Sequence, residues 1–335
     1  TTGGLTFIGI SLFIFMMANV VTSSPRTQVT QGPPLGPGYA LMNMLPAIPT
    51  RPDSNLIGPL RVQYVEGQAV AGESVVDQSL PTTLTPRQTY LARVAKASAI
   101  LAHLAIVSGI VLIGNRHFGN LNAGMGCALL YLILPYTAQM TGRVDHAVPA
   151  ALLLWAVLLY RRPMLAGMFL GLAGGLVYYP LFLLPLWLSF YWQRGLRAFL
   201  TGFLVMIVVL MLTLSLDKSA SLLEHFQRMF GLFNPVTDAA SLSGFWSLGI
   251  NPIWRLPVIV GFVIVSVLFA AWPAQKNFGT LMSGSAAVMV AAQFWHGYGG
   301  GLYLAWFLPL LLLVIFRPNV QDRTAMKMVL GSERR

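Results

Sequence analysis

Residues 142–197 read GRVDHAVPAALLLWAVLLYRRPMLAGMFLGLAGGLVYYPLFLLPLWLSFYWQRGLR, and this order of polar and apolar stretches decides the fold class. A polar turn opens the segment, and an arginine pair and a Tyr-Tyr-Pro step then divide a series of apolar runs. Unbroken apolar runs are typical of membrane helices, whereas the strands of a membrane barrel alternate polar and apolar residues. The segment therefore predicts several short, directly connected helices in a membrane.

Composition extends this prediction to the whole chain. Of its 335 residues, 56% are hydrophobic and 9% are charged, while a soluble domain carries about 25% charged residues. An ordinary water-soluble enzyme is therefore excluded, and we predict an all-α polytopic membrane protein with about ten transmembrane segments. The candidate segments are residues 5–21, 97–114, 121–140, 147–160, 164–177, 180–192, 198–216, 256–272, 278–295 and 301–316.

The apolar run from residue 164 to residue 192 has two interpretations. Tyr178-Tyr179-Pro180 divides it into two halves, and a proline inside such a run either kinks one helix or separates two. We favour a helical hairpin over one kinked span, because a hairpin leaves the basic residues of the flanking connections on one side of the membrane.

Charge predicts which side of the membrane each connection faces. With a cytoplasmic N-terminus, the short cytoplasmic connections and the tail hold eleven Lys and Arg residues, and the short outer connections hold four. The positive-inside rule therefore favours an N-in/C-in topology in a bacterial-type plasma membrane. Eight of the ten carboxylates fall outside, so chemistry is expected there. The net charge of +11 comes without a basic, aromatic-interleaved stretch that would indicate nucleic-acid binding.

This topology divides the chain into six parts. They are a first transmembrane helix (1–21), an extracytoplasmic loop (22–96), a membrane core (97–216), a second extracytoplasmic loop (217–255), C-terminal membrane helices (256–316) and a cytoplasmic tail (317–335). The second loop contains an amphipathic stretch, Ser219–Phe233, that predicts a helix lying in the membrane interface. The single cysteine, Cys127, excludes an intrachain disulfide and a Cys-based zinc site.

The turn Gly142-Arg143-Val144-Asp145-His146 is the sharpest candidate for chemistry. An Asp beside a His at a membrane surface can act as a base, orient a substrate hydroxyl or bind a divalent cation. The alternative is a solvated loop in which Asp145 only favours the start of the next helix. The sequence leaves both interpretations open.

Two further features carry candidate side chains. Trp295-His296-Gly297-Tyr298 precedes a glycine run, so His296 and Tyr298 either line a pocket or belong to an aromatic belt and a flexible turn. His103 falls inside an apolar span, where a histidine is either functional or neutral and bonded to a neighbouring helix.

Taken as a whole, residues 142–197 resemble the membrane core of the GT-C glycosyltransferases, most closely the bacterial polyprenyl-phosphate-sugar mannosyltransferase-like group. The resemblance rests on the order of a polar turn, an apolar span, Arg161-Arg162-Pro163, the glycine-rich AGMFLGLAGG, a Tyr-Pro step and an aromatic span. It covers residues 90–200, and the remainder is similar in topology alone.

This resemblance implies an enzyme that moves a sugar from a lipid-linked phosphate donor to an acceptor on the outer side, with or without a divalent cation. The family places a catalytic acid in the first outer loop, which makes Asp53 the candidate here. Asp53 or Asp145 would serve as the base, and His146 or His296 would supply a supporting hydrogen bond. The remaining candidates, which would bind the donor, are Arg143, Arg228, Arg255 and Tyr298.

Three alternatives compete with this interpretation. A secondary transporter would carry ionisable groups near the bilayer midplane and would show inverted repeats, whereas these spans hold few ionisable groups and no evident repeat. A polymerase or ligase of surface polysaccharide would place its large outer loop late in the chain, and here the larger loop comes first. An inactive structural membrane protein is the third alternative. Membrane lipid is an expected partner under all of them.

Overall fold

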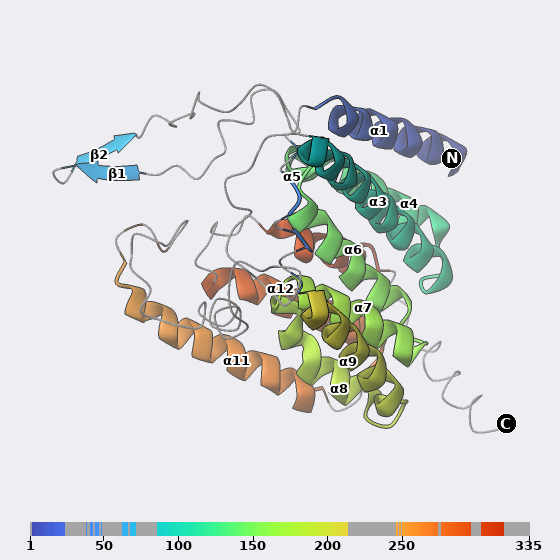
Figure 1. Ribbon diagram of the computed structural model, residues 1–335. Helices are drawn as coiled ribbons and strands as arrows, with labels where there is room; N and C mark the ends of the chain where they lie inside the picture. The colour runs from blue at the N-terminus through green and yellow to red at the C-terminus, as the bar shows by residue number, and fades with distance from the viewer. Residues whose placement is uncertain are drawn as a thin grey trace.

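The computed structural model describes most of the helical part of the chain (Figure 1). The described residues are 2–23, 38, 41–42, 44–46, 48, 62–65, 68–71, 86–213, 246, 248, 250–273, 276–295 and 303–317. The helices are α1 (Thr2–Thr22), α3 (Pro86–Arg116), α4 (Leu121–Ile133), α5 (Pro135–Met140), α6 (Val144–Leu158), α7 (Pro163–Leu176), α8 (Leu184–Tyr191), α9 (Leu196–Thr213), α11 (Arg255–Ala271), α12 (Phe278–Trp295) and α13 (Leu308–Phe316). Three short 3₁₀ helices join them: η2 (Tyr179–Leu183), η7 (Pro252–Trp254) and η8 (Leu304–Trp306).

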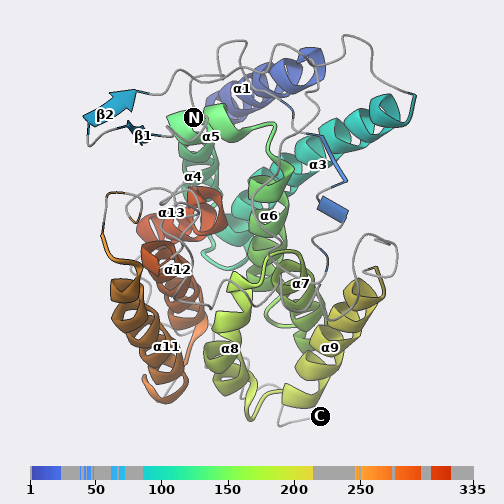
Figure 2. The ribbon, with the colours of Figure 1, turned by 60° about the vertical axis from the view of Figure 1, so that its left-hand side comes forward.

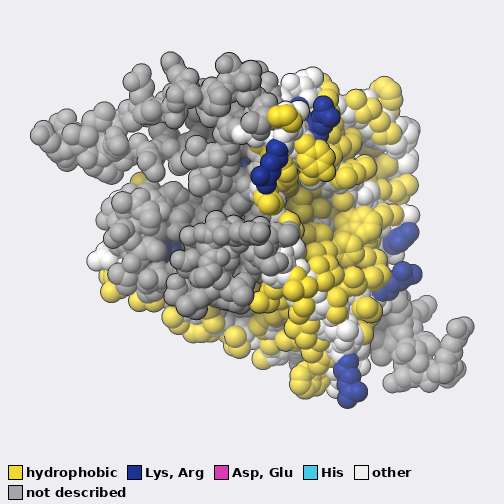
Figure 3. All heavy atoms as spheres, in the orientation of Figure 1, with side chains coloured by type: hydrophobic (Ala, Val, Ile, Leu, Met, Phe, Trp, Pro, Cys, Tyr) yellow, Lys and Arg dark blue, Asp and Glu magenta, His cyan; other side chains and the backbone are white. Residues whose placement is uncertain are grey.

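Each of the ten predicted apolar segments contains helix. Three helices, α1, α3 and α9, are long and apolar enough to cross a membrane by themselves, and α6, α7 and α11 are shorter apolar helices. Hydrophobic side chains cover much of the described surface in Figure 3, between Lys and Arg side chains near its upper edge and along its right and lower edges. This apolar surface suits a helical protein that lies in a membrane.

The predicted loop 22–96 differs from the structure in two respects. Strands β1 (Val62–Val65) and β2 (Gln68–Ala71) form an antiparallel hairpin with Val62 opposite Ala71, so the described fold is not wholly helical. Helix α3 begins at Pro86, inside the predicted loop. It extends this far because Ala92, Ala95 and Ala99 recur on one helical face and are buried, although the residues between them are more polar.

The helix ends collect at two ends of the bundle. At the first, which we call the Asp145 end, Val20 of α1, Ala95 of α3 and Val144 of α6 pack in one cluster. At the other, which we call the His117 end, the His117 ring bonds the carbonyl of Leu158, and the Tyr191 hydroxyl donates to the carbonyl of Tyr160. The start of α6 therefore lies at the Asp145 end and its last turn at the His117 end.

Helices α7 and α8 form the hairpin that the sequence favours. The chain leaves α7 at Leu176 and turns through η2. The Tyr191 hydroxyl at the end of α8 donates to the carbonyl of Tyr160, just before α7. The start of α7 and the end of α8 therefore both lie at the His117 end. Figure 2 shows α7 next to α9, and α8 between this pair and α11.

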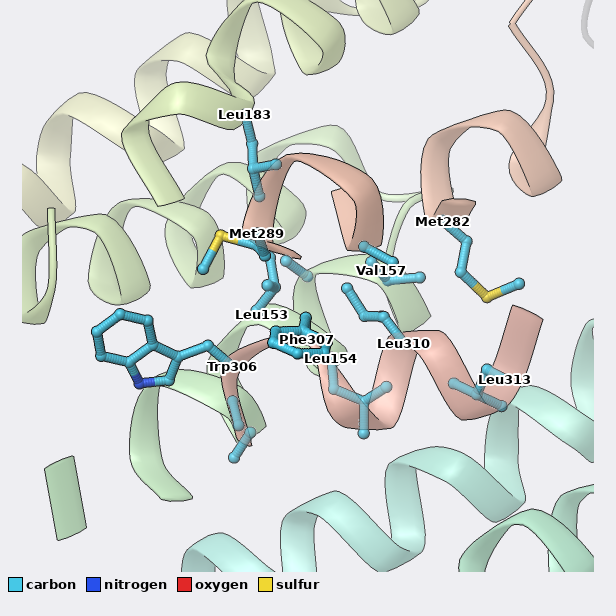
Figure 4. Close-up of a cluster of buried hydrophobic side chains, with 14 of the residues drawn as sticks. Leu153, Leu154, Val157, Leu183, Met282, Met289, Trp306, Phe307, Leu310 and Leu313 are labelled. Atoms are coloured by element: carbon cyan, nitrogen blue, oxygen red, sulfur yellow. The ribbon is translucent and has the colours of Figure 1, made fainter. Parts of the chain in front are cut away.

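Part of the core lies between α6 and the helices α12 and α13. Leu153, Leu154 and Val157 of α6 face Leu310 of α13 and Met289 of α12 (Figure 4). All are at most 1% exposed, so each contributes about 1.5–3 kcal/mol of hydrophobic free energy where its surroundings are as apolar as a soluble core. This packing holds the C-terminal half of α6 against α12 and α13, and the candidate turn lies at the other end of the helix.

Close backbone contact joins α7 to α9. A Cβ atom at Gly167 would overlap the carbonyl oxygen of Phe199, and one at Gly202 would overlap the carbonyl oxygen of Met164. Small residues at such crossings let membrane helices approach closely, and dispersion then drives association.

We predict that Gly167→Ala and Gly202→Ala each lower the thermal stability of the purified protein, because the methyl group forces α7 and α9 apart. Overpacking of this kind typically costs about 1–3 kcal/mol. Gly261→Ala in α11 is the matched control, since no atom lies within 4 Å of its added Cβ. Alanine there should be neutral or stabilising by up to about 1 kcal/mol. Equal losses at Gly261 and Gly202 would contradict the close approach.

Candidate functional site

A bidentate ion pair forms at the start of α6. Arg143 Nε donates to Asp145 Oδ1 at 2.9 Å, and Arg143 Nη2 donates to Asp145 Oδ2 at 2.7 Å. Asp145 is the one carboxylate among the described residues, and its side chain is 6% exposed, against 34% for Arg143. Its charge raises the pKa of Arg143 above the ordinary value. Asp145 also lies in the first turn of α6, where the helix dipole favours a negative charge.

His146 is held against the same carboxylate by aromatic side chains. The Tyr136 hydroxyl lies 2.6 Å from His146 Nδ1, and the ring of Tyr303 stacks on the imidazole with centroids 4.7 Å apart. His146 Nε2 is 3.7 Å from Asp145 Oδ2, which is too long for a hydrogen bond. The imidazole is therefore oriented by its neighbours, and its Nε2 faces the ion pair.

Two distant elements fix the backbone of the turn. The indole of Trp306 in η8 donates to the carbonyl of Asp145 at 3.2 Å. On the other side, His103 Nε2 lies 3.1 Å from the carbonyl oxygen of Thr141, and the Tyr131 hydroxyl lies 3.0 Å from His103 Nδ1. A neutral imidazole that donates from Nε2 and accepts at Nδ1 satisfies both bonds. His103 is thus bonded to neighbouring elements, which is one of the two roles expected for it.

The first loop also reaches this turn. A Cβ atom at Gly142 would overlap the backbone carbonyl of Ile48, so the two backbones are in direct contact. Ile48 is buried, and it belongs to the cluster that contains Val144. Ile48 precedes the candidate acid Asp53 by five residues, and Asp53 itself lies outside the described residues.

A series of neighbouring aromatic rings extends from this turn into the bundle, and we call it the aromatic series. Tyr303 stacks on Trp306 at 4.2 Å, Trp306 meets Tyr179 at 5.2 Å, and Tyr179 meets Trp295 at 5.3 Å between ring centroids. At its far end, Arg255 Nη2 donates to the carbonyl of Trp295 at 3.1 Å. Arg255 is 1% exposed, so a second cation is buried beside the same rings.

The structure thus brings Arg143, Asp145 and His146 into one cluster and places Arg255 at the far end of the aromatic series. Four other predicted site residues lie outside the described residues, as does the predicted interfacial helix Ser219–Phe233: Asp53, Arg228, His296 and Tyr298. Among the described residues, no three His, Cys, Asp or Glu side chains are grouped as a metal site would require.

Sequence reasoning missed the aromatic partners. Tyr178-Tyr179-Pro180 was interpreted as a helix break, and Trp306 and Tyr303 as part of an apolar segment. A usable signal existed, because an indole or phenol inside a membrane run needs a hydrogen-bond partner. The partner itself, the carbonyl of Asp145, is 161 positions away from Trp306 and cannot be read from local sequence.

Comparison with known proteins adds no family assignment: neither a protein-family model nor a curated protein sequence matches this chain.

We predict that Arg143→Gln and Asp145→Asn are coupled in a double-mutant cycle of unfolding free energy. Each single change leaves a charge without its partner, while the double change removes both. Because a third of the Arg143 side chain is exposed, we expect a coupling of about 1 kcal/mol, between the values for exposed and buried pairs. Thermal or denaturant unfolding in detergent measures it, and strictly additive losses would contradict a direct pair.

Proposed function

We propose that this chain is an integral membrane glycosyltransferase of the GT-C type, which moves a sugar from a polyprenyl-phosphate carrier to an acceptor hydroxyl on the extracytoplasmic face. The observation that carries the proposal is the composition of the Asp145 end. The only described carboxylate lies there, paired with Arg143 and beside an oriented histidine, and a series of aromatic rings leads from it to a second, buried arginine, Arg255. The order of motifs over residues 142–197 supports the same family.

The arginines suit the phosphate of the donor. Arg143 is partly exposed, and Arg255 is buried beside Tyr179 and Trp295. A guanidinium in a dry environment stabilises the negative charge that develops on a phosphate leaving group. The aromatic series is buried, and through Trp306 and Tyr303 it holds the Asp145 carbonyl and the His146 ring in place.

The ion pair with Arg143 determines when the Asp145 carboxylate can act as a base. In the free protein, Arg143 occupies both oxygens of Asp145. A donor phosphate competes for the same guanidinium, and its binding frees the carboxylate to accept a proton. The base is therefore available when donor is bound, which limits wasteful hydrolysis of the donor by water.

Sugar transfer forms one bond and breaks one bond at the anomeric carbon. The acceptor hydroxyl loses its proton to Asp145, and its oxygen forms a bond to the anomeric carbon. The bond between that carbon and the phosphate oxygen breaks, and the lipid phosphate leaves with the electron pair. His146, held by Tyr136, orients the carboxylate or the acceptor hydroxyl. A general base contributes about 10²–10⁴-fold to the rate.

We further propose that the ten apolar segments are all spans, in an N-in/C-in topology in a bacterial-type plasma membrane. Helices that are too short to cross the membrane alone are extended by an adjoining 3₁₀ helix, as η2 extends α8. The basic residues at the His117 end support a cytoplasmic position for that end.

We predict that Asp145→Asn lowers sugar transfer by at least about 100-fold, because the amide cannot accept the proton. The matched pair is Trp306→Phe and Trp155→Phe. Each removes one indole bond to a backbone carbonyl, at Asp145 for Trp306 and at Ala105 for Trp155. Transfer from a radiolabelled polyprenyl-phosphate sugar should fall for Trp306→Phe and stay near wild type for Trp155→Phe. Wild-type transfer by Asp145→Asn would overturn the assignment of the base.

We predict that a cysteine at position 143, in a Cys127→Ser background, is labelled by a membrane-impermeant maleimide added outside intact cells. A cysteine at position 161 serves as the control, because Arg161 lies near the His117 end and should be labelled only after the membrane is opened. The reverse pattern would place the Asp145 end in the cytoplasm.

A further inference from the structure

The His117 end carries an aromatic surface of its own, which we call the aromatic floor. Tyr160 stacks on Phe278 with centroids 4.6 Å apart, and His117 meets the same Phe278 at 4.8 Å. Phe190 lies 6.1 Å from Tyr160 in an edge-on arrangement. These rings come from the ends of α3, α6 and α8 and the start of α12, so the floor joins four elements that are far apart in sequence.

Arginines surround this floor. The Arg161 guanidinium lies over Tyr160 at 5.7 Å from the ring centroid, and the Arg194 guanidinium lies over Phe190 at 5.8 Å. The Arg317 guanidinium lies against Gly279, next to Phe278. Arg116, Arg161 and Arg194 are exposed. The only carboxylate in the described part of the chain is Asp145, at the other end, so Arg161 and Arg194 have no described carboxylate beside them.

His117 adds a polar atom beneath the cations without adding charge. Its Nε2 lies 3.0 Å from the carbonyl of Leu158, and its Nδ1 is buried without a hydrogen-bond partner. Burial lowers the pKa of His117, and the charges of Arg161 and Arg116 lower it further. The imidazole is therefore neutral at physiological pH, and the positive potential of this end comes from the guanidinium groups.

Two exposed tryptophans mark the depth of this end in the membrane. Trp192 and Trp272 are 71% and 74% exposed. The Ser189 hydroxyl of α8 donates to the carbonyl of Ala270 in α11, which brings the ends of these two helices together. Tryptophan is enriched at the headgroup level of a bilayer, so the arginines next to these ends lie where lipid phosphates are concentrated.

We propose that the His117 end binds the phosphate headgroup of an anionic phospholipid, held by Arg161 and Arg194 above the aromatic floor. The two guanidinium groups lie over neighbouring rings, so their side chains are packed as well as charged. A guanidinium recognises phosphate through paired N–H donors. The depth of Trp192 and Trp272 favours a lipid over a soluble phosphate. The proposal does not rest on the proposed glycosyl transfer.

Native mass spectrometry of the purified full chain tests this proposal, with phosphatidylglycerol as the probe and phosphatidylcholine as the zwitterionic reference. The test variant is Arg161→Gln with Arg194→Gln. Its control is Arg87→Gln with Arg93→Gln, which removes two exposed arginines from the start of α3, toward the Asp145 end. We expect phosphatidylglycerol affinity to fall about five-fold for each arginine removed at the His117 end, the scale of one basic residue facing anionic lipid. The control should retain wild-type affinity.

Three outcomes would overturn the proposal: equal losses in the test and control variants, unchanged affinity in the test variant, or equal affinity of the wild type for the two lipids. If millimolar inorganic phosphate displaced phosphatidylglycerol, the ligand of this end would be a soluble phosphate and not a lipid. Arg161→Lys with Arg194→Lys keeps the charge and loses the paired donors, so it should bind more weakly than wild type. Its thermal unfolding, and that of the Gln variant, confirms that each variant is folded.

Discussion

The bidentate pair between Arg143 and Asp145 is the interaction around which the Asp145 end is organised. A carboxylate whose side chain is 6% exposed in an apolar bundle needs a cation and hydrogen-bond donors, and Arg143 supplies both from two residues away. The remaining contacts hold this pair in place. Trp306 takes the Asp145 carbonyl, and Tyr136 and Tyr303 fix His146. Proton transfer and phosphate binding, which we propose for this cluster, both require fixed geometry.

The described carboxylate and a group of exposed arginines lie at opposite ends of the bundle. Asp145 lies at one end, and Arg116, Arg161 and Arg194 lie at the other, where an aromatic floor replaces acidic partners. Between these ends the described helices bury almost wholly apolar side chains, with His103 bonded to Tyr131 and Thr141 as an exception. In our proposals, the first end carries the sugar-transfer site and the second binds a lipid phosphate.

The sequence predicted the positions of the helices and the candidate turn well, because both depend on local patterns. Apolar runs mark the helices, Pro180 marks the reversal between α7 and α8, and Arg143, Asp145 and His146 are neighbours in the chain. The early start of α3 was missed, because Ala92, Ala95 and Ala99 form a buried face within a polar stretch. The contact of Ile48 with Gly142 and the bond from Trp306 to Asp145 join distant segments. Only tertiary packing specifies them.

The central claim is that the Asp145 end binds a lipid-linked sugar phosphate, and photo-crosslinking tests it most directly. The probe is a polyprenyl-phosphate sugar with a diazirine on the first isoprene unit, next to the phosphate, bound to the full-length chain and analysed by peptide mass spectrometry. The account predicts crosslinks to peptides that contain Arg143–His146, Tyr303–Trp306 or Arg255, and their suppression by unlabelled donor. Crosslinks confined to peptides of the His117 end, or the same pattern with a polyprenol that lacks the phosphate sugar, would contradict it.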